Sequence, residues 1–220
     1  MFVLASTSPR RRQLLEMLAI PFTIHPVEVD ETPQPDEHPA EYVRRLSLSK
    51  ALQAAEQLDR QAIILAADTT VAIQTEADRW SILGKPADAR HAAEMLRCLR
   101  GRVHYVFTGL ALLRNMDGRL WSDVCTSEVP MRNFSEEEMY AYIASGDPLD
   151  KAGAYAIQHE GFHPVEKFEG CFANVMGLPL CHLAQMLDQA GISVQNQISL
   201  RCVRSLGYPC ALDQRYGFRR

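Results

Sequence analysis

Near its start the chain passes directly from an apolar run into a helix start, and this junction constrains the local fold more than any other feature. Residues 2 to 5, Phe-Val-Leu-Ala, have the composition of a short strand. Ser8 is a good N-cap, and Pro9 suits the first helical position, where its missing N–H costs nothing. Apolar residues continue at helical spacing, at Leu14, Leu15, Met17 and Leu18. The sequence therefore predicts a strand, a turn and a helix before residue 20.

Three consecutive arginines, Arg10 to Arg12, follow the predicted helix cap. Free N–H groups and the helix dipole favour a phosphate at such a terminus, and guanidinium groups add forked donors. We interpret residues 6 to 12 as a cradle for a triphosphate. A basic arm or a solvated charge run is the alternative, which these residues alone do not exclude. The segment has neither a P-loop pattern nor a G-x-G-x-x-G turn.

Composition limits the classes of protein to consider. The 220 residues, 47% of them hydrophobic, suit one domain of generous size or two lobes that share a sheet. We expect a cytoplasmic protein without a membrane segment, because the sequence has no apolar run of about 18 residues and no signal-peptide core. A net charge of -4 argues against nucleic acid as a partner. Six scattered cysteines without a C-x-x-C pair indicate reduced thiols.

Lysine is rare in this chain: of 23 basic residues, four are lysines. Lys50 falls on the apolar side of a helix predicted over residues 39 to 58, Lys85 stands in a Gly-Lys-Pro turn, and Lys151 stands in a glycine-bearing loop. A compact ammonium is not equivalent to a guanidinium where geometry is tight, so these three lysines suit phosphate neutralisation. Chance retention is the alternative for each, and Lys167 fits an ordinary surface position.

Asp68 is the sharpest candidate for a catalytic residue. It follows residues 62 to 67, a continuous apolar run typical of a strand buried on both faces. We expect Asp68 at the C-terminal edge of that strand, where ligands of α/β sheets bind. Burial would raise its pKa and a nearby cation would lower it; either setting suits a metal ligand or a general base. The alternative is a carboxylate that caps its own turn through Thr69 or Thr70.

A second carboxylate for the same cleft could come from the Asp30-Glu31 pair, which follows a weakly alternating strand predicted over residues 22 to 27. Mg²⁺ and Mn²⁺ prefer oxygen ligands and commonly use one or two protein carboxylates together with substrate phosphates. A solvated acidic loop is the alternative for this pair.

Other segments complete the predicted organisation. Two long paired strands are expected over residues 103 to 113 and 120 to 129, and a capping box at Ser135 begins a helix. Shorter strands are expected over 155 to 158 and 165 to 168, and a last helix over 180 to 190. Residues 193 to 220 carry five arginines against one aspartate. We expect an appended, partly disordered tail or, alternatively, an extra packing segment that uses Leu200, Val203, Leu206, Tyr208 and Phe218.

Five motifs, in order and over nearly the whole chain before the tail, resemble those of the Maf family of nucleotide pyrophosphatases. They are Leu4 to Arg11, Ala67 to Thr69, Leu83 to Pro86, Asp150 to Gln158, and Asn174 to Leu180. The resemblance implies an α/β fold with an elongated mixed central sheet, flanking helices and two lobes around a cleft, formed by residues 1 to 192. It also implies hydrolysis of a nucleoside triphosphate to the monophosphate and pyrophosphate with a divalent cation, and a homodimer.

The resemblance assigns roles residue by residue. Asp68 would accept the proton of the attacking water, and Glu31 would join it in holding the metal. The substrate-binding residues, most of them on the phosphates, would be Ser6, Ser8, Arg10, Arg11, Lys50, Thr69, Lys85, Lys151 and Gln158. Charge logic agrees, because cations would neutralise the triphosphate while water attacks beside a carboxylate.

Thr69 together with Gln158 resembles the branch of the family that acts on dTTP and UTP. A glutamine amide offers a donor and an acceptor that match the imide edge of thymine or uracil. Two residues depart from the family pattern: His159 replaces a glycine, and Thr70 replaces a bulkier apolar residue. Activity on 7-methyl-GTP, broad specificity, or a nucleotide-binding regulator of cell division are the alternatives. Asp68, Lys85 and Glu31 together favour an enzyme, because a binding module needs no water-activating carboxylate.

Overall fold

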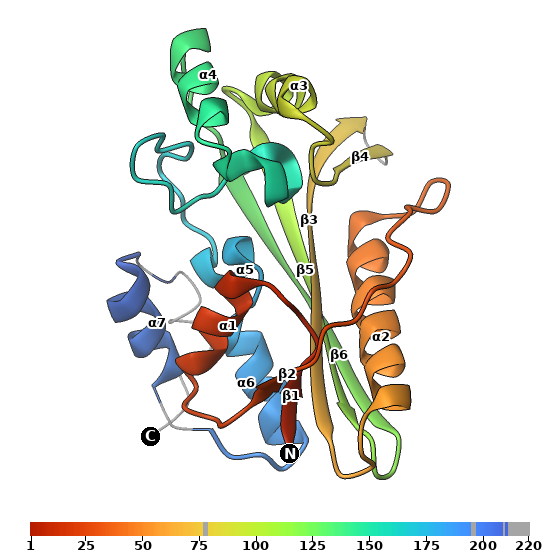
Figure 1. Ribbon diagram of the computed structural model, residues 1–220. Helices are drawn as coiled ribbons and strands as arrows, with labels where there is room; N and C mark the ends of the chain where they lie inside the picture. Colours follow the sequence, from red (N-terminus) through yellow and green to blue (C-terminus); the bar gives the residue numbers. More distant parts are fainter. Residues whose placement is uncertain (77–78, 195–196, 209, 211–220) are drawn as a thin grey trace.

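The computed structural model describes residues 1 to 76, 79 to 194, 197 to 208 and 210, and within them the fold is a mixed α/β sheet with helices on both faces (Figure 1). The strands are β1 (Phe2–Leu4), β2 (Thr23–Ile24), β3 (Ile63–Glu76), β4 (Arg79–Leu83), β5 (Val103–Arg114) and β6 (Arg119–Pro130). Their order is β2-β1-β3-β5-β6, and β4 also pairs with β3. The β2-β1-β3 pairs are parallel and the other pairs are antiparallel. The mixed sheet confirms the predicted fold class.

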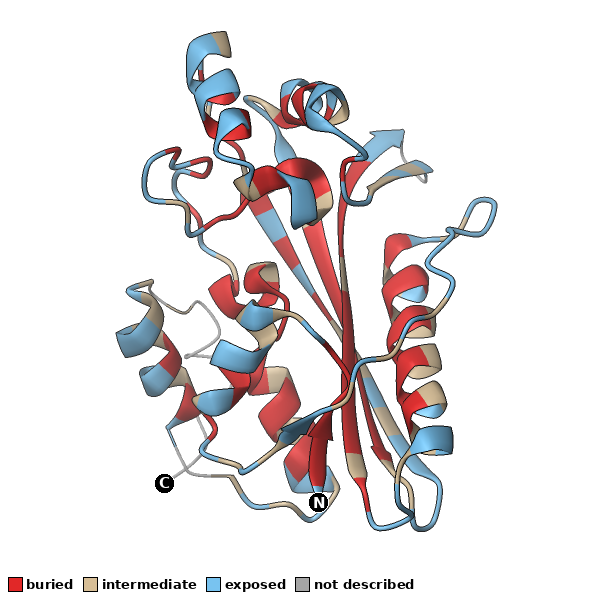
Figure 2. Ribbon diagram, in the orientation of Figure 1, coloured by how far each residue is buried: buried red, intermediate tan, exposed pale blue. Residues whose placement is uncertain are grey.

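Helices divide the molecule into two lobes along the long strands (Figure 1). In the lower lobe α2 (Pro39–Gln57) covers one face, while α1 (Pro9–Glu16), α5 (Phe172–Met176), α6 (Leu180–Gln189) and α7 (Ile198–Leu206) lie on the other. The upper lobe contains β4, α3 (Ala89–Leu99), α4 (Glu136–Ala144) and the short 3-10 helices η1 (Asp147–Asp150) and η2 (Ala152–Ala154). Figure 2 shows that the buried residues lie where these helices and the sheet face one another.

Gly109, which has no side chain, allows α2 to pack close to the sheet. Gly109 is the cross-strand partner of Asp68, and a Cβ atom there would lie 2.3 Å from the carbonyl oxygen of Val43 on α2. Small residues fill the rest of this contact, including Ala51, Ala54, Ala66 and Ala111. The close packing seats the side chain of Lys50, which α2 carries, directly beside Asp68.

The position of Asp68 differs from the prediction. Asp68 lies in the middle of β3, because the β-branched residues after it continue the strand and pair with β5. On the other edge of β3, the pairing with β1 extends only as far as Leu65, and the pairing with β4 starts at Val71. Among the described residues no strand pairs with that edge over residues 66 to 70. The opening beside Asp68 is therefore a gap in the sheet edge, which we call the edge gap, and not the end of a strand.

Two short strands were wrongly predicted. Residues 155 to 158 and 165 to 168 form no strand; the segment makes one isolated bridge, between Met131 and Val165. Left-handed backbone at Ala154, His163 and Lys167, with φ of 59°, 43° and 55°, interrupts the extended conformation. The second strand is also shorter than expected, at two residues, whereas the helix from Pro39, the β5-β6 pair and the capping box at Ser135 are confirmed.

Part of the C-terminal segment packs on the body. In α7, Ile198 and Cys202 are buried, and the Tyr208 ring stacks on Phe172 with 4.4 Å between ring centroids. Residues 211 to 220, with Phe218, lie outside the described part of the chain. Across the described ranges, no helix has the length and apolar character needed to cross a membrane.

Candidate active site

A cavity of about 760 Å³ lies at the edge gap and brings the predicted site residues together. Its wall includes all eleven, which come from segments far apart in the sequence: Ser6, Ser8, Arg10, Arg11, Glu31, Lys50, Asp68, Thr69, Lys85, Lys151 and Gln158. The topology explains the convergence, because β1 and β3 are adjacent parallel strands and place the start of α1 next to Asp68.

The start of α1 has the predicted cap. Ser8 is the N-cap, and its Oγ accepts a hydrogen bond from the Arg11 N–H at 3.4 Å. Ser6 Oγ in turn accepts from the Ser8 N–H at 3.2 Å. These two hydroxyls hold the turn between β1 and α1, so that the first residues of the helix lie at the cavity wall.

Arg11 is held by three separate segments. Its Nε donates to the Gly177 carbonyl at 3.0 Å, and its two terminal nitrogens donate to Ser6 Oγ at 3.3 Å and to Thr69 Oγ1 at 3.1 Å. Gly177 has a φ of 107°, and a Cβ there would lie 3.2 Å from Thr69 Oγ1 and 3.4 Å from Arg11 Nε. Only glycine fits this position comfortably, because both the backbone conformation and the space exclude a side chain.

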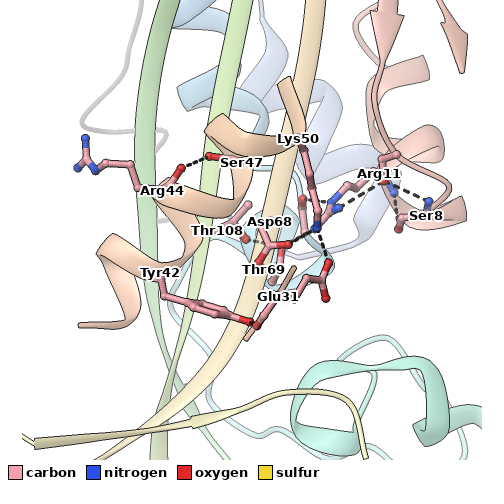
Figure 3. Close-up of polar contacts among 12 residues, drawn as sticks. Ser8, Arg11, Glu31, Tyr42, Arg44, Ser47, Lys50, Asp68, Thr69 and Thr108 are labelled. Atoms are coloured by element: carbon pink, nitrogen blue, oxygen red, sulfur yellow. Dashed lines mark hydrogen bonds and ion pairs between the residues drawn. The ribbon is translucent and has the colours of Figure 1, made fainter. Parts of the chain in front are cut away.

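Lys50 bridges two carboxylates at the edge gap (Figure 3). Its Nζ lies 2.5 Å from Asp68 Oδ1 and 2.6 Å from Glu31 Oε1. Burial raises the pKa of Asp68, and the charges of Lys50 and Arg11 offset only part of that effect. Burial also opposes ionisation of Glu31, but the hydrogen bond and charge of Lys50 outweigh it and lower its pKa. Two carboxylates whose pKa values are displaced in opposite directions are typical of an acid or base beside a permanently charged partner.

The two carboxylates fit a divalent cation. Both converge on one positive charge, and their oxygens are the ligands that Mg²⁺ and Mn²⁺ prefer. Within the described residues no group of three or more acidic, histidine or cysteine side chains could hold a metal alone. This donor set suits a cation that takes its remaining ligands from water and a bound phosphate.

Lys151 is held by a second acidic pair in the upper lobe. Its Nζ lies 2.6 Å from Asp150 Oδ1 and 3.0 Å from Asp147 Oδ1. Asp150 also reaches across the cavity to Arg10, with 3.8 Å between the charged atoms. Lys85 and Gln158 are exposed at the cavity wall. Asp30, the neighbour of Glu31, instead accepts a hydrogen bond from the Thr32 N–H and does not line the cavity.

Sequence reasoning missed several polar groups around the cavity. Tyr42 donates from its hydroxyl to the Glu31 carbonyl at 2.8 Å, although its spacing placed it with the apolar face of α2. Asp150 stands at the start of a motif, but its sequence context did not indicate an ion pair with Lys151. Thr108 and Asn174 lie fully buried behind Thr69. A threonine inside the apolar run of β5 was a signal that could have identified Thr108.

The arrangement combines a cationic surface with an activated carboxylate. Of the described residues, five basic side chains line the cavity: Arg10, Arg11, Lys50, Lys85 and Lys151. Such a surface favours a polyphosphate, and a carboxylate with a raised pKa beside it can accept a proton from water. The apolar part of the wall, which includes Ile157, Val175 and Met176, offers room for an uncharged ring.

Comparisons with known proteins identify the family of this chain. A sequence profile described as "Maf-like protein" matches residues 1–190. The chain is 46% identical over 193 residues to the dTTP/UTP pyrophosphatase of Thermomicrobium roseum, covering 87% of this chain and 85% of the relative. It is 42% identical over 193 residues to the dTTP/UTP pyrophosphatase of Dictyoglomus thermophilum, covering 87% and 97%. A solved structure, a nucleoside-triphosphatase/dITP/XTP pyrophosphatase from Mycobacterium abscessus, aligns over 86% of this chain and 96% of its own, with 13% identity and a TM-score of 0.42. The profile match and the relatives show that the chain belongs to the Maf family.

Proposed function

We propose that this protein hydrolyses dTTP and UTP to the nucleoside monophosphate and pyrophosphate. The observation that carries the proposal is the Asp68–Lys50–Glu31 cluster at the edge gap, inside a cavity lined by five basic side chains. The similarity to the dTTP/UTP pyrophosphatases of Thermomicrobium roseum and Dictyoglomus thermophilum supports the choice of substrates.

In the proposed mechanism the triphosphate lies along the start of α1 and contacts Ser8, Arg10, Arg11, Lys85 and Lys151. A water molecule attacks the α-phosphorus and transfers its proton to the Asp68 carboxylate. The new P–O bond forms as the bond between the α-phosphorus and the bridging oxygen breaks, so that pyrophosphate leaves. The raised pKa of Asp68 suits this role, because a base works best when its pKa approaches the operating pH.

Asp68 and Glu31 would hold a divalent cation, Mg²⁺ or Mn²⁺. When bound, this ion would neutralise charge on the phosphates and polarise the P–O bonds. Lys50 keeps the two carboxylates together in the absence of that ion, since its ammonium satisfies both of them. Arg11 stays in place through its bonds to Ser6, Thr69 and Gly177, so its charge needs no reorganisation during the reaction.

A panel of nucleoside triphosphates, assayed with and without Mg²⁺ or Mn²⁺, tests the proposal directly. We expect dTTP and UTP to be the best substrates, the nucleoside monophosphate and pyrophosphate to be the products, and chelation to abolish turnover. Release of orthophosphate as the first product, or a preference for 7-methyl-GTP, would contradict the proposal. The homodimer that the family resemblance implies is tested separately by light scattering after size-exclusion chromatography.

A matched pair of variants separates phosphate binding from base recognition. Lys85→Ala should weaken UTP binding far more than uridine binding, because its charge is assigned to the phosphates. Gln158→Glu should lower kcat/KM for dTTP and UTP, because a carboxylate repels the carbonyl groups of the imide edge, while activity on a guanine nucleotide stays level or rises. If Gln158→Glu lowers kcat/KM equally for nucleotides of every base, Gln158 supports the conformation of its loop and does not recognise the base.

A further inference from the structure

Thr69 lies in a chain of hydrogen bonds whose directions are fixed by a carbonyl acceptor at one end. Thr108 Oγ1 donates to the Asn174 carbonyl at 3.0 Å, and a carbonyl oxygen can only accept. A hydroxyl has one proton, so Thr108 has none left for its second contact, the 3.0 Å contact with Thr69 Oγ1. Thr69 must therefore be the donor in that contact (Figure 3).

The other partner of Thr69 uses an acceptor site. Arg11 donates from its terminal nitrogen to Thr69 Oγ1 at 3.1 Å, and a guanidinium has no acceptor to offer in return. Thr69 Oγ1 has thus committed its proton to Thr108 and one of its two lone pairs to Arg11. Towards a ligand in the cavity it can only accept a hydrogen bond.

The buried residues around Thr69 keep these hydrogen-bond directions fixed. Thr108 and Asn174 have no exposed surface. The Asn174 amide nitrogen donates to the Val106 carbonyl and to Ser127 Oγ, both at 3.0 Å, which anchors the residue whose carbonyl accepts from Thr108. If Thr69 turned its proton towards the cavity, Thr108 Oγ1 would lose its donor inside the protein, at a cost typical of a buried unsatisfied group.

Thr69 also faces the part of the cavity that suits a ring. Successive residues of a strand point to opposite faces, so Asp68 lies on the α2 side with Lys50 while Thr69 lies on the side of Arg11 and Gly177. The adjoining wall is the apolar segment of Val175 and Met176. The carboxylates and the remaining acceptor of Thr69 are therefore on different faces of β3, and the acceptor adjoins the apolar wall that suits a base.

We propose that Thr108 is a specificity-determining positioning residue: by taking the proton of Thr69, it makes Thr69 an acceptor for the N3–H group of uracil or thymine. Cytosine has a lone pair at N3, and two acceptors facing each other cannot bond. The proposal rests on the proposed function and adds a reason why a uracil nucleotide is accepted and a cytosine nucleotide is refused. Thr108 itself touches no substrate.

Thr108→Val tests this directly, because valine keeps the shape of threonine and removes the hydroxyl. Thr69 would then be able to turn its proton towards the cavity and donate to cytosine N3. We expect the wild-type protein to prefer UTP over CTP by about 100-fold or more, and Thr108→Val to reduce that ratio of kcat/KM values at least about tenfold. Thr108→Ser should restore the ratio, and Thr126→Val, an exposed substitution on the neighbouring strand, should leave it unchanged.

An unchanged UTP to CTP ratio in a folded Thr108→Val protein would overturn the inference, as would a parallel loss on both nucleotides. If Thr108→Val does not fold, the wild-type protein decides the question with 3-methyluridine triphosphate, which lacks the N3 proton. We expect its kcat/KM to fall at least about 100-fold below that of UTP; equal turnover would overturn the inference. Failure to hydrolyse any nucleoside triphosphate would instead reject the proposed function, while equal turnover of UTP and CTP would reject only the role of Thr108.

Discussion

Lys50 and Lys151 are each held between two carboxylates, yet one acid of the lower cluster, Asp68, is buried more deeply than either acid of the upper cluster. In the lower cluster Asp68 has 9% of its side chain exposed; in the upper cluster Asp150 has 66% exposed. Burial raises the pKa of Asp68. Burial opposes ionisation of Asp147 as well, but hydrogen bonds from Tyr142 and Lys151 outweigh it and lower the pKa of Asp147.

The difference shows that composition alone does not identify a catalytic carboxylate. Both clusters contain one lysine and two acids, and both line or adjoin the same cavity. A general base needs a carboxylate that binds a proton readily, which burial provides at Asp68. The pKa of Asp147 is lowered, so Asp147 stays ionised and competes with phosphate for Lys151. Four experiments test this contrast.

The largest effect is expected for Asp68→Asn. The amide keeps the shape of the side chain but can neither accept the proton nor bind a cation with full charge, so kcat/KM for UTP should fall about 10²- to 10⁴-fold. The matched change in the upper cluster, Asp147→Asn, should cost less than about tenfold because that acid carries no proton in the mechanism. Pyrophosphate release measures both. Near-wild-type turnover by a folded Asp68→Asn protein would remove Asp68 from the catalytic role.

Lys50→Met should have the next largest effect. It leaves two carboxylates facing each other at the edge gap without their shared cation, and breaking a buried ion pair typically costs about 3 kcal/mol or more. We expect a lower midpoint of urea unfolding and about 100-fold lower kcat/KM. Lys151→Met, whose acids keep more contact with water, should destabilise the fold by about 1 kcal/mol or less. Equal destabilisation by the two variants would show that burial does not distinguish the clusters.

The pH profile of kcat/KM should follow the protonation of Asp68. Because the base must be ionised and its pKa is raised, activity should fall as the pH drops, with a midpoint above the ordinary aspartate value of 3.8. The charge of Glu31 contributes to the raised pKa of Asp68 in the metal-free protein, and kcat/KM reports the free enzyme, so Glu31→Gln should move the acidic limb to lower pH whatever happens to the maximal rate. Asp147→Asn serves as the control and should leave the limb in place. If Glu31→Gln does not shift the acidic limb of the pH profile, that limb does not report the ionisation of Asp68.

The smallest effect is expected for Asp150→Asn. This change removes a mostly exposed carboxylate from Arg10 and Lys151, so that both can bind phosphate without breaking an ion pair with Asp150. An exposed ion pair contributes about 0.2 to 1 kcal/mol, and KM for UTP should therefore decrease by about fivefold or less, with the difference shrinking at high salt. An increase in KM would show that Asp150 positions the two cations and does not compete with the substrate.

Much of the fold followed from local signals. The cap at Ser8, the box at Ser135 and the continuous apolar run before Asp68 each depend on interactions between near neighbours in sequence, which a sequence pattern records directly. The strands expected near residues 155 and 165 failed because their alternation resembles a strand, while left-handed residues such as Ala154 and His163 prevent one. Conformation at single residues is decided by tertiary packing, which periodicity does not contain.

In the candidate site, too, local sequence patterns predicted some residues and missed those that depend on tertiary packing. The motif residues could be grouped because their chemical types suit phosphate and metal, and all of them line one cavity. Their partners could not be predicted: Thr108 acts through Thr69, and Asp150 pairs with Arg10 across the cavity. Such pairings depend on which strands become neighbours, and the length of β3 beyond Asp68 moved that residue from a strand end to the edge gap.

The continuity of β3 also limits how the molecule can move. Its 14 residues form one continuous strand, roughly 45 Å long, that runs through both lobes. From Ile63 to Ala72 it is paired without interruption to β5, across the level of the cavity. Rotation of one lobe against the other would have to bend or break that ladder. We therefore expect nucleotide binding to exchange side-chain partners while the two lobes keep their relative orientation. The radius of gyration in small-angle scattering should then be the same with and without nucleotide.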